Sequence, residues 1–236
     1  DNYKNNDRIK MLRLDCEFNF SYLNNRAVEF CNGEYIVLLN NDTELITPNW
    51  LEIMVGYAMQ KHIGCVGVKL LYPDNTIQHG GVILGLGGVA SHSFIGESRN
   101  SKGFNGLLEV PTNYAAVTAA CLMVNKNKYL KVGGLSEDLK VAYNDIDFNI
   151  KLLEIGYYNI FLPQVELYHY ESKSRGLDTT GEKYERFLNE SSIMMKKWEK
   201  YISCDPFYNP NYSLKAHYRL DRQAKSEGVN KYENKK

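Results

Sequence analysis

The chain has 236 residues, of which 44% are hydrophobic and 24% are charged, and its 28 basic and 28 acidic side chains give a formal net charge of zero. This composition is ordinary for a soluble globular protein of one large domain or two small ones, and the balanced charge argues against a broad nucleic-acid-binding surface. No run approaches the roughly 18 consecutive apolar residues of a membrane span. The 5 cysteines are scattered, without a CxxC pair, which fits a reducing compartment and argues against a zinc site.

A buried strand that ends in polar residues is the main signal near the start of the chain. A helix is predicted over 21–32, and the apolar run 35–39 follows it. A short continuous apolar run is typical of a strand buried on both faces of a parallel sheet. The run stops at Asn40-Asn41-Asp42, which an open α/β sheet would place at the edge where ligands bind. A polar turn before a helix is the alternative interpretation.

The rest of the chain continues this alternation. The stretch 76–111 is glycine-rich, and residues 85–90 lack the strand, helix and acidic residue that a dinucleotide fingerprint needs, so we interpret them as part of a mobile loop over a cleft. The other predicted elements are a helix from Thr47 and Pro48 to about residue 62, a buried strand at 64–71, a strand at 119–124, a short helix capped by Asn125, a helix capped by Asn144 and running to about residue 153, strands at 157–162 and 166–170, and a helix at 182–201.

This succession predicts an α/β fold with a mixed, mostly parallel sheet flanked by helices. Residues 1–181 would form the domain that holds the sheet. Residues 182–236 would form a C-terminal helix and a polar tail, packed on that domain or trailing from it. The end of this tail, 226–236, has the composition of a disordered segment.

Three further polar sets accompany the predicted elements. Asp145 and Asp147 would lie in a first helical turn, where the helix dipole favours ionised carboxylates that can act as general bases. Alternatively, they only satisfy the helix start. His169 ends a predicted strand, although a lone histidine more often has a core or capping role. Ser172 and Arg175 belong to a basic, hydroxyl-rich loop that could hold phosphate oxygens or simply be solvated.

Taken in order, these sets resemble family 2 glycosyltransferases with the GT-A fold, in the subgroup that includes rhamnosyltransferase-like enzymes of bacterial surface polysaccharides. The matching segments are Asn19-Phe20 through Asn25-Arg26-Ala27, Gly33-Glu34-Tyr35, Leu38-Leu39-Asn40-Asn41-Asp42-Thr43, Pro48-Asn49-Trp50-Leu51, Gln78-His79-Gly80-Gly81, Gly133-Gly134-Leu135-Ser136-Glu137, Asn144-Asp145-Ile146-Asp147-Phe148, His169 with Ser172 and Arg175, and Asp205-Pro206-Phe207-Tyr208-Asn209-Pro210-Asn211.

The resemblance implies a metal-dependent, inverting hexosyltransferase that moves a sugar from a nucleotide-diphosphate donor to a hydroxyl of a saccharide or lipid-linked saccharide. It implies a cytoplasmic location, with peripheral association at the inner face of the membrane and self-association as further expectations. Residue by residue, it makes Asp145 the catalytic base, Asp42 and His169 the ligands of Mg or Mn, Asn40, Asn41, Ser172 and Arg175 donor-binding residues, and Asp147 and His79 acceptor-binding residues.

Three departures from the family pattern keep other interpretations open. Asn40 stands where the first aspartate of the DXD motif is usual, and Asn144 stands where a glutamate usually precedes the base. The family's opening strand, with its nucleotide-binding signature, has no counterpart at the start of this sequence, so we expect the N-terminal part of the domain to be missing. A non-catalytic binding or scaffold module and a nucleotidyltransferase, which also uses carboxylates and Mg, are the alternatives.

Overall fold

The structure is a computed structural model that describes residues 6, 8–170 and 181–221. The predicted disordered segment 226–236 lies outside these residues. The helices are α1 Phe20–Glu29, α2 Trp50–Ala58, α3 Lys126–Lys131, α4 Asn144–Glu154 and α5 Gly181–Ser203, with a 3₁₀ turn at Phe104–Gly106. The strands are β1 Tyr35–Leu39, β2 Thr43–Leu45, β3 Ile63–Leu71, β4 Ile77–His79, β5 Val82–Leu84, β6 Ala90–His92, β7 Thr112–Tyr114, β8 Cys121–Asn125 and β9 Tyr158–His169.

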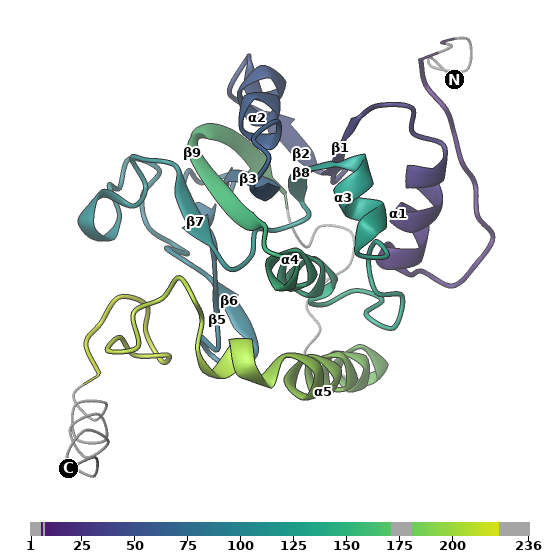
Figure 1. Ribbon diagram of the computed structural model, residues 1–236. Helices are drawn as coiled ribbons and strands as arrows, with labels where there is room; N and C mark the ends of the chain where they lie inside the picture. The colour runs from purple at the N-terminus through teal and green to yellow at the C-terminus, as the bar shows by residue number, and fades with distance from the viewer. Residues whose placement is uncertain (1–5, 7, 171–180, 222–236) are drawn as a thin grey trace.

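A mixed seven-stranded sheet forms the centre of the fold (Figure 1). Its strands follow the order β1-β8-β3-β9-β2, with β4 beside β3 and β7 beside β9. The prediction of a mostly parallel sheet is wrong, because among the described residues β3 and β9 form the single parallel pair and the other pairs are antiparallel. The apolar run of β3 reflects its burial on both faces by the elements that cover the sheet. This burial does not determine whether a neighbouring strand is parallel or antiparallel.

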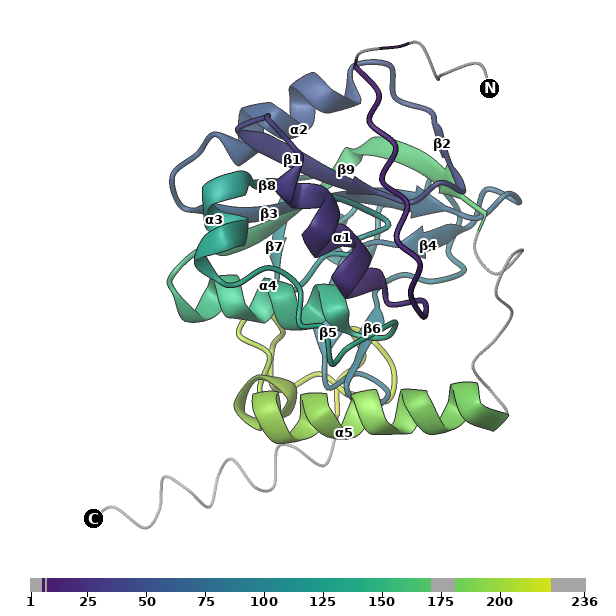
Figure 2. The ribbon, with the colours of Figure 1, turned by 90° about the vertical axis from the view of Figure 1, so that its right-hand side faces the viewer.

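Helices cover both faces of this sheet (Figures 1 and 2). On one face, Met54 and Ala58 of α2 pack against β3, β8 and β9. On the other face, α1, α3 and α4 contribute Val28, Tyr129 and Phe148 to a second cluster of buried side chains. Each helix is amphipathic enough to bury one side on the sheet and expose the other, which is the usual way an α/β domain closes its core.

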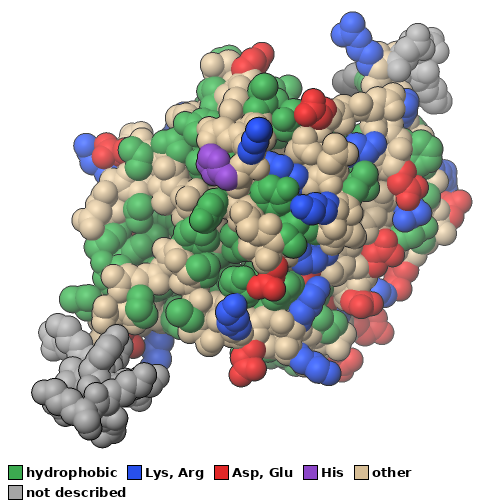
Figure 3. All heavy atoms as spheres, viewed as in Figure 1, with side chains coloured by type: hydrophobic (Ala, Val, Ile, Leu, Met, Phe, Trp, Pro, Cys, Tyr) green, Lys and Arg blue, Asp and Glu red, His purple; other side chains and the backbone are tan. Residues whose placement is uncertain are grey.

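The C-terminal helix α5 packs below the sheet, against α4 and the β5–β6 hairpin (Figure 2). Met194 and Ile202 of α5 are buried in a third cluster with Ile150 of α4 and Leu84 of β5. On the face shown in Figure 3, basic and acidic side chains are interspersed rather than gathered by sign. None of the helices in the described part of the chain combines the length and hydropathy that a membrane span requires.

One predicted helix cap is confirmed, and three predicted features of the elements are corrected. Asn125 caps α3, because its side chain accepts the amide hydrogens of Asn127 and Lys128. The helix predicted from Thr47 instead begins at Trp50, after Asn49. The helix predicted from an Asn144 cap has Tyr143, in a left-handed conformation, as its N-cap, so Asn144 is its first helical residue. The strands predicted at 157–162 and 166–170 are one strand, β9.

The glycine-rich segment 85–90 comprises the turn of a β-hairpin, residues 85–89, and the first residue of β6, and it is not the start of a nucleotide-binding helix. The Gly85 amide donates to the Val89 carbonyl at 2.8 Å and closes the turn between β5 and β6. Gly85 has a φ of +77°, and a Cβ there would meet the Ile202 carbonyl oxygen of α5 at 2.3 Å. Glycine is therefore required both by the turn and by the close approach of α5.

Candidate active site

A cavity of about 580 Å³ opens where the ends of β1 and β9 meet β6, the segment before β8 and the start of α4. Asn40 follows β1, His169 ends β9 and Asp145 lies at the start of α4, so the fold brings these three sequence-predicted residues together. Mixed polar and apolar walls suit a ligand that is both hydroxylated and carbon-rich. The polar lining is Asn40, Ser91, His92, Thr118, Asn144, Asp145 and His169, and the larger apolar side chains are Phe20, Leu86, Tyr143 and Phe187.

The half-buried carboxylate of Asp145 is held in a defined direction. Its Oδ1 accepts the amide hydrogen of Ile146 at 2.8 Å, and its Oδ2 accepts that of Ala119 at 3.1 Å. The positive end of the α4 dipole lies beside it. Asp145 therefore sits at the cavity wall as a carboxylate with fixed geometry, which is what a general base or an anchor for a hydroxyl needs.

Two fully buried asparagines fix the segment that supplies the Ala119 amide. Asn149, one turn after Asp145, accepts from the Val117 amide at 3.3 Å and donates to the Val117 carbonyl at 3.0 Å. Asn159 of β9 donates to the carbonyls of Ala115 at 2.9 Å and Asn149 at 3.1 Å. Since buried amides without partners are costly, these bonds hold the segment before β8 against α4.

Antiparallel pairing of β2 with β9 brings Asp42 to His169. Thr43 lies opposite His169 in the register, and the Tyr170 amide donates to the Asp42 carbonyl at 2.9 Å. His169 Nδ1 lies 2.7 Å from Gln78 Oε1, an acceptor, so the proton of the neutral ring is on Nδ1 and the lone pair is on Nε2. That Nε2 atom lies 3.2 Å from Asn40 Nδ2 and 3.2 Å from Asp42 Oδ1.

Asp42 and His169 fit a divalent cation. Asp42 Oδ1 is buried and has no hydrogen-bond partner among the described residues, although His169 Nε2 is 3.2 Å away. With the neutral tautomer set by Gln78, the lone pairs of His169 Nε2 and Asp42 Oδ1 face each other, and a cation that took the place of the Asn40 amide donor at Nε2 would balance both. In the part of the chain that the structure describes, no three His, Cys, Asp or Glu side chains converge, so further ligands would have to come from phosphate oxygens or water.

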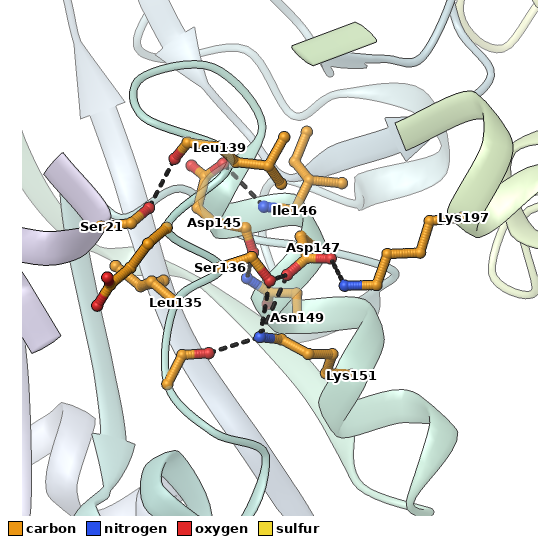
Figure 4. Close-up of polar contacts among 12 residues, drawn as sticks. Ser21, Leu135, Ser136, Leu139, Asp145, Ile146, Asp147, Asn149, Lys151 and Lys197 are labelled. Atoms are coloured by element: carbon orange, nitrogen blue, oxygen red, sulfur yellow. Dashed lines mark hydrogen bonds and ion pairs between the residues drawn. The ribbon is translucent and has the colours of Figure 1, made fainter. Parts of the chain in front are cut away.

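Asp147 does not reach this cavity. Its fully buried carboxylate lies between α4 and α5, where Oδ1 contacts Lys197 at 2.6 Å and Trp198 at 2.8 Å. Oδ2 contacts Ser136 at 2.6 Å and Lys151 at 3.2 Å. Figure 4 shows Asp147 pointing toward Lys197 and Lys151, away from the direction of Asp145. Burial by itself raises the pKa of Asp147, but the two lysines, Ser136 and Trp198 together hold it below its ordinary value.

The remaining predicted site residues do not line this cavity or lie outside the described residues. Asn41 is exposed in the turn after β1 and does not line the cavity. His79 is fully buried behind His92, with 2.7 Å between their Nδ1 atoms, and it does not line the cavity. Ser172 and Arg175 lie outside the described residues.

Sequence reasoning missed residues that support the site. Gln78, which sets the tautomer of His169, was part of a recognised motif but was not assigned a role. Glu190 accepts the amides of Val141 at 3.1 Å and Ala142 at 2.7 Å, and so fixes a wall of the cavity. Its position three residues after Phe187 and four before Met194, on the apolar side of a predicted helix, was a usable signal. No local pattern marked His92.

Comparison with known proteins places these features in a family context. Residues 1–129 match the model of glycosyl transferase family 2. The uncharacterized protein y4gI of Sinorhizobium fredii is 46% identical over 208 residues, which are 88% of this chain and 23% of that protein. The O-antigen biosynthesis protein RfbC of Myxococcus xanthus is 34% identical over 211 residues, 89% of this chain and 16% of that protein.

A more distant relative is the N-acetylglucosaminyl-diphospho-decaprenol L-rhamnosyltransferase of Mycobacterium tuberculosis, 27% identical over 62 residues, which are 26% of this chain and 20% of that protein. The matched segments thus cover less than 25% of the length of each of these relatives.

Two solved structures share the fold. GalNAc-T7, in a crystal structure with UDP, GalNAc and Mn²⁺, has a TM-score of 0.59 at 12% identity and covers 81% of this chain and 37% of its own. The mannosyltransferase PcManGT of Pyrobaculum calidifontis, in complex with GDP-Man and Mn²⁺, has a TM-score of 0.54 at 13% identity and covers 83% of this chain and 52% of its own. At these identities the likeness shows the fold alone, which is GT-A-like.

Proposed function

This chain belongs to glycosyl transferase family 2, and from that membership we propose that it transfers a sugar from a nucleoside-diphosphate donor to a hydroxyl of a saccharide acceptor, with inversion at the anomeric carbon. The observation that carries the proposal is the shared cavity: the fixed carboxylate of Asp145 and the donor-side residues Asn40 and His169 line the same space of about 580 Å³. A single displacement needs a base and a leaving-group site on either side of one sugar ring.

Asp145 is the general base in this mechanism. The acceptor hydroxyl approaches Asp145, gives its proton to the carboxylate and attacks the anomeric carbon as the bond to the diphosphate breaks. The amides of Ala119 and Ile146 hold the carboxylate in place during this step. Asn149 and Asn159 fix the segment that carries the Ala119 amide, so they position the base without touching the substrate.

Asp42 and His169 form the leaving-group side, with Asn40 and Asn41 beside them and Ser172 and Arg175 as additional donor-binding residues. Asp42 and His169 would hold a divalent cation, Mg or Mn, which when bound neutralises charge on the departing diphosphate. Gln78 keeps the lone pair of His169 on Nε2, facing Asp42. Both solved neighbours contain Mn²⁺, which supports this assignment.

For Asp147, we propose a positioning role instead of direct contact with the acceptor. Its carboxylate joins α4 to α5 through Lys197 and Trp198, and this contact sets the orientation of the helix that starts beside Asp145. His79 acts in the same indirect way, through His92.

The substrate class follows from the relatives. We propose an acceptor in a bacterial surface polysaccharide, supported by the similarity to an O-antigen biosynthesis protein and, over a shorter stretch, to a rhamnosyltransferase that acts on a diphospho-decaprenol-linked sugar. A lipid-linked acceptor would bring the protein to the cytoplasmic face of a membrane as a peripheral enzyme.

The experiment is a transfer assay with the full-length protein, Mn²⁺ and a panel of UDP-, GDP- and dTDP-sugars, in which release of nucleoside diphosphate is measured with and without saccharide acceptors. Wild type should turn over at least one donor. Asp145→Asn should lower kcat by about 10²–10⁴-fold and leave donor binding nearly unchanged, because asparagine keeps the shape but cannot accept the proton.

Asp138→Asn, at an exposed position in the loop before α4, is the matched control and should behave as wild type. Normal turnover by Asp145→Asn would remove the base from the mechanism. Donor binding without turnover by wild type across the panel would instead support a non-catalytic binding module.

A further inference from the structure

The segment that follows α5, residues 204–221, contains a motif at 205–211 that the proposed function does not use. This segment lies beside the β5–β6 hairpin (Figures 1 and 2). The carboxylate of Asp205 accepts the amide hydrogen of Phe207 at 2.7 Å and that of Leu84, in β5, at 2.8 Å. The first bond shapes the motif and the second joins it to the hairpin, so the motif is attached to an element that lines the candidate active site.

The rest of the segment folds back on itself. Tyr212 and Leu220 form an antiparallel bridge. The hydroxyl of Tyr208, within the motif, donates to the Ser213 carbonyl at 3.1 Å and accepts the Tyr218 amide hydrogen at 2.7 Å. These bonds connect the motif to both arms of the fold-back and give the segment a defined shape.

Tyr218 fixes this segment to the body of the domain. Its ring stacks on Phe94, with centroids 5.1 Å apart, and on Phe104, with centroids 5.0 Å apart. Its hydroxyl lies 2.9 Å from that of Tyr114. Tyr218 has a φ of +55° and Phe94 a φ of +62°, and bulky residues keep such left-handed conformations only where the surrounding packing holds them. The aromatic stack therefore determines where the segment lies.

The segment and the end of α5 together hold the glycine-rich turn 85–88. The Gly87 amide donates to the Leu214 carbonyl at 2.9 Å. A Cβ on Gly85 would lie 2.3 Å from the Ile202 carbonyl oxygen and 3.1 Å from Leu214 Cδ1. Because β5 and β6 form a two-stranded sheet of their own, the position of the turn at their far end depends on these contacts and not on pairing with the central sheet.

The turn is also part of the wall of the cavity that contains Asp145. Leu86 and Gly87 both line this cavity, and Leu86 is one of its larger apolar side chains. Tyr143, another of these apolar side chains, lies two positions before Asp145 in the chain. A displacement of the turn would therefore change the shape of the space beside the carboxylate of Asp145.

We propose that segment 204–221 positions the turn 85–88 as a wall of the acceptor site, and that Tyr218 is the positioning residue that holds the segment in place. This inference rests on the proposed function. The acceptor must approach Asp145 at a fixed distance and angle, and the apolar side chain of Leu86 suits the carbon face of a saccharide ring. A small misplacement of such a wall lowers the fraction of molecules that can bind the acceptor correctly.

The first test is hydrogen exchange of the turn in the full-length protein, which needs no substrate. Tyr218→Ala removes the aromatic stack, so exchange in the peptide that contains Gly87 should become about tenfold faster or more as its bond to Leu214 opens. Tyr218→Phe keeps the stacked ring and should exchange as wild type does. Tyr184→Ala, at a position of α5 that is 44% exposed, is the control and should change nothing. Unchanged exchange in Tyr218→Ala would overturn the inference.

The second test is the transfer assay with the same variants. In Tyr218→Ala the acceptor KM should rise about tenfold if the turn keeps its position one-tenth of the time, with kcat at saturating acceptor and the donor KM unchanged. Tyr218→Phe should restore the acceptor KM, and Tyr184→Ala should match wild type. A raised donor KM with a normal acceptor KM would overturn the assignment of the turn to the acceptor.

A third comparison displaces the turn without changing the aromatic stack. Gly85→Ala should raise the acceptor KM, because its Cβ would meet the Ile202 carbonyl oxygen at 2.3 Å. Gly133→Ala is the matched control, since Gly133 has the same φ of +77° and no atom within 4 Å of an added Cβ. Equal acceptor KM values for the two variants would contradict the proposal. If wild type transferred no sugar from any donor, the proposed function and the acceptor assignment would both fail, and hydrogen exchange would still decide whether Tyr218 holds the turn.

Discussion

Gly67 of β3 and Val117 are in such close contact that a Cβ atom on Gly67 would lie 2.4 Å from the Val117 Cβ. This approach lets the segment before β8 cross the sheet, where Asn149 binds it and Ala119 reaches Asp145. A glycine in the middle of a buried strand, usually unfavourable for strand stability, is therefore required for the geometry of the candidate active site.

Gly67→Ala should destabilise the protein by about 1–3 kcal/mol, because an inserted methyl group overpacks a site that has no room for it. It should also lower kcat, since Val117 must move and carries with it the amide that holds Asp145. Urea unfolding and the transfer assay measure the two effects. Gly56→Ala is the control, because Gly56 is exposed on α2 with no atom within 4 Å of an added Cβ. Equal behaviour of the two variants would contradict the packing argument.

Asp42→Ala should abolish Mn²⁺ or Mg²⁺ binding measured by calorimetry in the presence of a nucleoside diphosphate, because it removes the unpaired Oδ1 beside His169. Gln78→Leu should weaken the same binding by about 10–100-fold, since the orientation and tautomer of His169 are then no longer fixed. Asp138→Ala serves as the control at an exposed position. Undiminished metal binding by Asp42→Ala would exclude Asp42 as a ligand.

Asp147→Asn should lower the free energy of unfolding at neutral pH by about 1–3 kcal/mol, because it removes the charge that pairs with the partly buried Lys151 and the more exposed Lys197 and weakens the hydrogen bonds of a buried carboxylate. The pKa of Asp147 lies below its ordinary value near 3.8 in the folded state. Its stabilising contribution is therefore present above that value and is lost as the pH falls through the folded-state pKa. The difference in stability between wild type and variant, from urea unfolding, should shrink on acidification below about pH 4, and a constant difference would contradict the assignment.

Glu190→Gln should destabilise the protein by about 1–3 kcal/mol, because the amide side chain has one acceptor oxygen for two partly buried N–H groups, those of Val141 and Ala142. Since these residues line the active-site cavity, the acceptor KM should rise as well. Glu199→Gln removes the same charge from an exposed position of α5 and should change neither quantity. If the two variants behaved alike, net charge and not the two hydrogen bonds would explain the result.

Asp205 should make stability depend on pH in the opposite direction from Asp147. Burial raises the pKa of Asp205 to about 6 in the folded state, against its ordinary value of 3.8, so the folded protein favours the protonated form. The contribution of Asp205 is fully present below pH 3.8 and is lost as the pH rises through about 6. Relative to Asp205→Asn, wild type should lose up to about 3 kcal/mol across this range. Urea unfolding at several pH values measures the difference, and a flat profile would rule out the raised pKa.

Features that depend on residues close together in the chain could be predicted from the sequence. The apolar run of β3 had to be a buried strand, and Asn125 had to cap a helix, because burial and capping depend on residues only a few positions away. The run of β1 also forms a strand, but the prediction that it is buried on both faces is wrong, since β1 lies at the edge of the sheet, is only half-buried and exposes Leu39. The position of Asp145 in the first turn of a helix could likewise be predicted from the residues next to it. The same helical geometry implied that Asp147, about 200° further around the axis, points to another side, and sequence reasoning did not use this.

Strand direction and the partners of the polar side chains depend on how the whole chain packs. The apolar run of β3 does not reveal whether its neighbours are parallel, since covering elements bury it in either case. The pairing of β2 with β9, which brings Asp42 to His169, joins residues more than 120 positions apart in the chain. The position of His92 against the buried His79 depends on the hairpin between them. Contacts of this kind form when the helices and strands that carry the two residues pack together. The residues next to each partner in the sequence do not determine them.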